Sequence, residues 1–138
     1  MTDVAPLIDG EALVYALMLR DKPSSSTMDS ELDVDTVDAL PATIYSLSVE
    51  GQTRNGRGLW PATLTLNHFG PDRDTAWAEA AAWYASVHRW PFTPMPDPSP
   101  GWVSSVDDVD APSKDSTSAI EGRGITQYTA VYSLLLRN

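Results

Sequence analysis

The residues that could do chemistry in this chain are few. His68 and His88 are its two histidines, and it has no cysteine, so it offers neither a thiolate nucleophile nor a cysteine zinc site. The two histidines fall on different expected elements, and neither has a serine placed to complete a catalytic triad. We therefore expect both histidines to be structural or to lie on the surface, and we expect no catalytic residue and no enzyme activity.

Two other stretches have the composition of ligand sites. Asp107, Asp108 and Asp110 could present oxygens to a hard divalent cation, but an acidic cluster at a strand end is usually only solvated. The glycine-rich stretch 51–58 lacks the Lys-Ser ending of a phosphate-binding loop and opens no helix, so it fits the tip of a hairpin. We expect no metal and no cofactor. On the tip, Arg54 and Arg57 could reach an acidic neighbour in an assembly.

Length and composition are those of one globular domain over residues 1–138. The apolar fraction of 42% is ordinary for such a domain. The longest apolar stretches fall short of the roughly 18 residues that a membrane span needs, and the first residues lack the basic start of a signal peptide. We expect a soluble protein made in the cytoplasm. The net charge of -10 argues against nucleic-acid binding, which depends on neutralising phosphates.

The elements that must position these residues follow from periodicity and from breaker residues. In the helix expected over 72–89, Asp72 or Asp74 should be the cap. Its core stripe would be Trp77, Ala80, Ala81, Tyr84, Val87 and His88. In the strand expected over 102–110, Val103, Val106 and Val109 recur at every third position, which indicates a bulge or a short strand with a frayed end. The expected order is a helix over 6–20, an acidic loop over 21–42, strands over 43–50 and 62–67, a helix over 72–89, a proline-rich connection over 90–101, a strand over 102–110, a polar hairpin loop over 111–124 and a closing strand.

The closing run, 124–137, predicts a strand that is apolar on both faces. One face carries Tyr128, Ala130, Tyr132, Leu134 and Leu136, and the other carries Ile125, Val131 and Leu135, interrupted by Gln127, Thr129 and Ser133. The second face is too apolar for plain contact with solvent, so it needs a covering element or another subunit. The predicted fold is α+β, a four-stranded, mostly antiparallel or mixed sheet with two helices packed on one face and long hairpin loops.

Three segments carry a resemblance to a known family. They are the opening helix over 6–20, the strand-then-helix block over 62–81 and the closing strand over 127–137. In order and texture the chain resembles the tail terminator proteins of long-tailed, siphovirus-type bacteriophages, in the branch that infects actinobacteria. In that family a strand of a small sheet leads into an alanine-rich helix, and the chain ends on a strand after a polar hairpin. The acidic segment over 24–40 is longer than the family plan leads us to expect.

The resemblance implies a structural role. Proteins of this family form a ring, commonly of six subunits, on the head-proximal end of the tail tube, where they stop tube polymerisation and present the surface to which the head docks. The partners would be other copies of the chain, the tail tube protein and a head-tail connector or neck protein, with DNA passing through without specific binding. The protein would be assembled in the host cytoplasm and located in the virion. The candidate interface residues are Arg54, Arg57, Ile125, Gln127, Thr129, Val131 and Leu135.

Two alternatives remain open. Another neck, connector or tail-completion protein would share the size and the strand-helix plan. A carbohydrate- or peptide-binding module would use Trp60, Trp90 and Trp102, which are expected at element ends near prolines, where exposed rings could stack on a sugar or a proline-rich peptide. Indoles at such positions more often close a core or fill a subunit interface.

Overall fold

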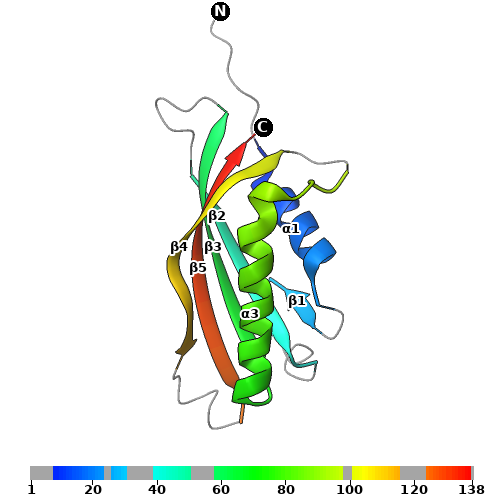
Figure 1. Ribbon diagram of the computed structural model, residues 1–138, viewed down its shortest axis with the longest axis vertical. Helices are drawn as coiled ribbons and strands as arrows, with labels where there is room; N and C mark the ends of the chain where they lie inside the picture. The colour runs from blue at the N-terminus through cyan, green and yellow to red at the C-terminus, as the bar shows by residue number, and fades with distance from the viewer. Residues whose placement is uncertain are drawn as a thin grey trace, which may run out of the picture.

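The computed structural model describes residues 8–23, 26–30, 39–50, 58–97, 101–115 and 124–137. These residues form an α+β fold in which a mixed sheet of five strands, in the order β1-β2-β3-β5-β4, is accompanied by two α-helices (Figure 1). The elements are α1 (Gly10–Asp21), β1 (Thr27–Asp29), β2 (Ala42–Val49), β3 (Leu59–Gly70), α3 (Arg73–Arg89), the 3-10 helix η1 (Trp90–Phe92), β4 (Trp102–Asp115) and β5 (Thr126–Arg137).

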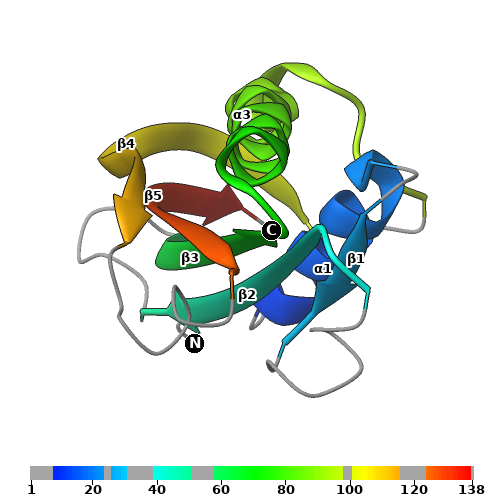
Figure 2. The same cartoon turned by 90° about the horizontal axis from the view of Figure 1, so that it is seen from below.

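Both helices lie on the concave side of the curved sheet, with α3 running along the central strands and α1 beside it (Figure 2). A single apolar cluster joins Leu13 and Leu17 of α1 to Trp83 of α3 and to the inward-facing residues of β3 and β5. The predicted packing of two helices on one face is therefore confirmed. Within the described ranges, no helix has the length and the apolar character needed to cross a membrane.

The closing strand alternates as its sequence predicts. The five residues expected on the core face are all buried, whereas Val131 and Leu135 on the other face are half-buried. Because β5 pairs antiparallel with β3 over its whole length, with Leu64 opposite Tyr132, the two strands present matched inner faces to the helices. Most of the core is built on this pair of strands.

The prediction of four strands was wrong, because a fifth strand, β1, lies within the segment expected to be an acidic loop. It pairs parallel to β2, with Thr27 opposite Ala42. Its three residues, Thr-Met-Asp, show no apolar alternation, so periodicity cannot reveal it. It is held by its surroundings, since Met28 packs against the core and the buried Ser26 hydrogen-bonds to α3.

Of the two explanations for the valine spacing in β4, a bulge is confirmed and a short, frayed strand is wrong. The pairing of β4 with β5 shifts between Val103 and Ser105 and again on either side of Asp110. The strand is longer than predicted and continues to Asp115, so the first part of the loop expected over 111–124 is strand. Each bulge inserts an unpaired residue, which explains why the valines do not alternate in the usual period of two.

Both helices differ in detail from their predictions. Helix α1 begins at Gly10, after an Asp9 cap, so Ile8 precedes the helix. Asp72 caps α3 as expected, its carboxylate accepting from the Thr75 N–H. The expected core stripe of α3 was wrong at Trp77, which is 43% exposed, and at Ala81, which is also exposed, whereas Trp83, outside that stripe, is fully buried. The buried face of α3 is rotated toward Trp83 because that indole has a buried partner on the same helix.

Candidate functional site

The outer face of the central strands is the broadest candidate surface. In the register of β3 and β5, Thr65 lies opposite Val131 and Pro61 lies opposite Leu135. No helix among the described residues packs on this face, since both helices lie on the other side (Figure 2). Of its outward-facing residues only Arg137, at one end, is charged; the others are Leu59, Pro61, Thr63, Thr65, Asn67, Gln127, Thr129, Val131, Ser133 and Leu135. We call this the open face.

The open face has an apolar end and a polar end. At the polar end, the amide of Gln127 donates to Asn67 Oδ1 over 3.1 Å, and the hydroxyl of Thr129 donates to the same oxygen over 2.8 Å. Gln127 is buried and Thr129 is half-buried, so these two predicted interface residues are engaged within the subunit. Val131 and Leu135 lie together on the apolar end, and Ile125 is half-buried just before β5. Arg54 and Arg57 lie outside the described residues.

A buried polar cluster lies on the other side of the sheet, centred on Glu79 of α3. Its Oε2 atom accepts from the hydroxyl of Ser26, from the hydroxyl of Thr43 over 2.6 Å and from Nε1 of Trp83 over 3.0 Å. Glu79 is only 4% exposed, and a buried carboxylate is stable only when donors satisfy it. The cluster therefore fixes α3 to the segment before β1 and to β2.

The same cluster sets the tautomer of His68. The Thr43 oxygen lies 2.7 Å from His68 Nδ1, and because the Thr43 proton is directed at Glu79, Nδ1 must be the donor to Thr43. His68 Nε2 is then unprotonated, and it has no hydrogen-bond partner among the described residues. Burial removes the imidazole from water and lowers the pKa of His68 to about 3.

The order of these groups does not suit nucleophilic catalysis. In a catalytic triad the imidazole lies between the carboxylate and the hydroxyl and takes the hydroxyl proton. Here the hydroxyl of Thr43 lies between Glu79 and His68, and all three side chains are buried. Sequence reasoning missed Glu79 and Thr43; the one available signal was an acid among alanines four residues before a tryptophan.

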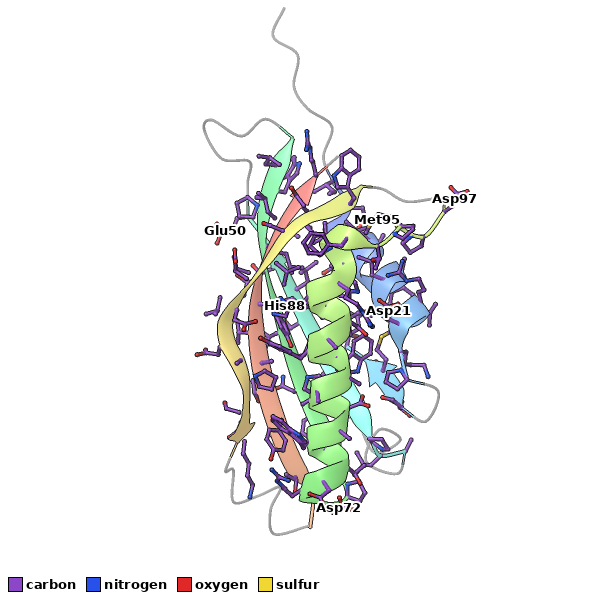
Figure 3. All side chains as sticks on the ribbon, viewed as in Figure 1. Asp21, Glu50, Asp72, His88, Met95 and Asp97 are labelled. Atoms are coloured by element: carbon purple, nitrogen blue, oxygen red, sulfur yellow. The ribbon has the colours of Figure 1, made fainter. Side chains whose placement is uncertain are left out.

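A second polar cluster fixes the edge strand β4 to α3. Asp108 accepts from the hydroxyl of Tyr84 over 2.8 Å and pairs with His88 Nε2 at 2.6 Å. Figure 3 shows His88 on the side of α3 that faces β4 and β5. Partial burial raises the pKa of Asp108, but the hydrogen bonds from Tyr84 and His88 outweigh it and bring the pKa below its usual value. Tyr132 packs edge-on against His88, and burial raises the pKa of its hydroxyl.

This geometry separates the acids that could have held a cation. Asp107 lies opposite Ser133 on the outer side of the sheet, and Asp108 lies opposite Tyr132 on the inner side. In the described part of the chain, no group of three or more His, Asp or Glu side chains is placed to hold a metal ion. Both histidines take part in contacts within the subunit.

The tryptophans expected at element ends are mostly buried. Trp60 is 8% exposed and Trp90 is fully buried, so neither can offer a ring face to a sugar or a peptide. Trp102 is 44% exposed, but the guanidinium of Arg137 lies over its ring at 5.5 Å. The carbohydrate or peptide module therefore loses two of its three stacking platforms.

No known protein-family model matches this chain, and no curated protein matches its sequence. The likeness to tail terminator proteins therefore rests on the residues and on the order of the elements.

Proposed function

We propose that this protein is a structural protein of a phage virion that forms a ring, six-fold as the family resemblance implies, on the head-proximal end of the tail tube. It would stop tube polymerisation there and present the docking surface for the head. The observation that carries the proposal is the open face, a sheet surface whose one charged residue is Arg137 at its end, in a chain that is 20% charged and has a net charge of -10.

A sheet face with so little charge is typical of a subunit contact. The cores of protein interfaces are depleted in charged residues, whereas a sheet face in water normally alternates with charged and polar side chains. Val131, Leu135 and Pro61 form the apolar part of the open face. Covering these residues with a second copy would remove apolar area from water, which favours association.

The acidic balance of the chain also supports the proposal. A net charge of -10 gives the surface a potential that repels phosphates. A ring of such subunits could surround DNA without binding it. The same property would suit a neck or connector protein, which is the second candidate function and would use the same open face.

The first test is the solution mass of the purified protein by light scattering over a range of concentrations. The proposal predicts a mass that rises toward about six times the 15.0 kDa subunit. In the Val131→Asp variant a charge would be buried at the contact, so the subunit should stay folded and monomeric. Ala81→Asp is the matched control, because Ala81 is exposed on α3 on the other side of the sheet.

The second test separates a terminator from another neck protein. Tail tube protein is polymerised with and without the purified chain, and tube lengths are measured by electron microscopy. A terminator should bind one end of each tube and shorten the tubes, and Val131→Asp should not. Unchanged lengths with an assembled ring would contradict termination and favour the neck role. Equal masses for Val131→Asp and the unmodified chain would contradict the assignment of the open face as the contact.

A further inference from the structure

Phe92 is the most exposed large apolar side chain in the described part of the molecule. It is 87% exposed, compared with 58% for Val109 and 52% for Leu19. It belongs to the short helix η1, which continues α3 beyond Arg89. An isolated exposed apolar residue is common on protein surfaces, so its support must decide whether it has a role.

The segment that carries Phe92 is held firmly in place. The neighbouring Trp90 is fully buried, and its Nε1 donates to Asp21 Oδ2 over 2.8 Å. Arg20 pairs with the same Asp21 and also donates to the carbonyl of Pro94 and to Thr93 Oγ1. Figure 3 shows Asp21 beside α3 on the side of α1. The end of α1 is therefore hydrogen-bonded to residues on both sides of Phe92. These contacts hold η1 in place while the Phe92 ring stays exposed to solvent.

A pocket large enough for a phenyl ring lies beside the N-terminal half of α3. Its volume is about 260 Å³, and its lining includes Pro23, Pro41, Thr75, Ala78, Glu79 and Ala82. Most of these side chains are apolar, and the Glu79 oxygen Oε2 is already satisfied by three donors. An apolar cavity of about 150 Å³ is enough to bind benzene, so a phenyl ring fits within this volume.

Phe92 cannot fill the pocket of its own subunit. From Ala82 to Arg89 the helix rises about 10 Å, at about 1.5 Å per residue, before η1 begins. Figure 3 shows Asp72 at one end of α3 and Met95 near the other. The ring and the pocket are therefore separate surfaces on one molecule, and only a second molecule can bring them together.

We propose that Phe92 of one copy inserts into the pocket between α3 and the Pro23 and Pro41 segments of the next copy. A contact between two different surfaces of the same chain is head-to-tail, and it closes into a ring when the rotation between subunits permits. This inference rests on the proposed function and adds a second contact to that of the open face. The charges beside the two surfaces are complementary. Arg89, which is exposed, precedes η1, and Asp72, which is exposed, lies beside Thr75 at the pocket.

Two variants test the contact from its two sides. Phe92→Glu removes the ring, and Ala82→Trp fills the pocket; both residues are exposed, so the subunit should keep its fold. Each variant alone should weaken assembly at least tenfold in light scattering. The matched controls are Val109→Glu, at another exposed apolar residue, and Ala81→Trp, at an exposed alanine outside the pocket lining, and both should assemble like the unmodified chain.

Mixing the two variants gives the decisive result. The Phe92→Glu chain keeps its pocket and the Ala82→Trp chain keeps its ring, so one copy of each can still form the contact, and an equal mixture should associate more strongly than either variant alone. Assembly of either variant like the unmodified chain would overturn the inference, as would an unmodified chain that is monomeric at every concentration. If Val131→Asp abolishes the ring and Phe92→Glu does not, the inference fails and the proposed function stands. If Phe92→Glu and Ala82→Trp disrupt assembly but tubes are not terminated, the proposed function fails and the contact stands.

Discussion

The hydroxyl of Thr43 lies 2.6 Å from Glu79 Oε2 and 2.7 Å from His68 Nδ1. One small side chain on β2 therefore joins a carboxylate on α3 to an imidazole on β3. All three residues are buried, and hydrogen bonds among buried groups are costly to leave unmade. The relationship connects the helix layer to the sheet beside β1, where the apolar pairing is weakest because β1 has only three residues.

Replacing Glu79 should destabilise the subunit more than replacing an exposed acidic residue. In Glu79→Ala the hydroxyls of Ser26 and Thr43 and the Trp83 N–H lose their acceptor, so the free energy of unfolding should fall by about 3 kcal/mol or more. Urea unfolding followed by tryptophan fluorescence measures it. Glu79→Gln keeps an acceptor oxygen and should lose less. Asp74→Ala, at an exposed site on the same helix, is the control and should change little; an equal loss there would refute the role of the cluster.

The stability of the protein should fall as the pH is lowered below 6.5, because of His68. Its pKa is about 3 in the folded chain and about 6.5 in the unfolded chain, so between these values the unfolded state binds more protons. The contribution of His68 is full above pH 6.5 and decreases by about 1.4 kcal/mol for each pH unit below it. His68→Asn removes the titration and keeps a donor near Thr43. Between pH 6.5 and 4.5, wild type should lose about 2 to 3 kcal/mol more than this variant in urea unfolding.

The comparison stops at pH 4.5 because two carboxylates also lower the free energy of unfolding at more acidic pH. Partial burial raises the pKa of Asp21 and of Asp108, but hydrogen bonds from their neighbours lower it further, so the net shift is downward for both. Their contribution is present above the unfolded pKa of about 4 and is lost as pH falls through the folded one. Parallel pH curves for wild type and His68→Asn above pH 4.5 would show that His68 is not buried in its neutral form.

Leu134 and Leu135 offer a matched pair on opposite faces of β5. Leu134 is 1% exposed within the core cluster, so Leu134→Ala should cost about 3 kcal/mol of unfolding free energy. Leu135 is half-buried on the open face, so Leu135→Ala should cost about 1 kcal/mol or less in the monomer and should weaken association instead. Denaturation at low protein concentration gives the first quantity and light scattering gives the second. Equal losses of monomer stability would mean that the open face is internal core.

Gly101 should not tolerate a side chain. A Cβ atom there would lie 2.3 Å from the carbonyl oxygen of Arg137 and 2.9 Å from Cδ1 of Ile8. Gly101→Ala should therefore force the start of β4 away from the end of β5 and cost about 2 kcal/mol or more. Gly124 has a φ of +74° and no atom within 4 Å of a built Cβ, so Gly124→Ala should cost only about 1 kcal/mol of backbone strain. Thermal unfolding of both variants compares crowding with strain, and a smaller loss at Gly101 would contradict the close approach.

Several features of the fold could be predicted from the sequence because they depend on local patterns. The inward and outward faces of β5, the Asp72 cap of α3 and the bulge of β4 follow from periods of two, from cap chemistry and from a broken alternation. These features need only near neighbours along the chain, so tertiary packing did not change them. The open face is the product of the same alternation, and the candidate residues Val131 and Leu135 lie on it as expected.

The tertiary structure decided what depends on residues far apart in the chain. Strand β1 exists because Thr27 finds Ala42 and because Ser26 reaches Glu79, and neither contact has a local signature. Glu79 can be buried because its carboxylate has three donors, whereas an isolated carboxylate could not be. One of these donors is Trp83, so the buried face of α3 includes Glu79 and Trp83 and leaves Trp77 exposed. The sequence determines which faces are apolar; only the folded chain determines which polar groups find partners, and that decides which of them the core can contain.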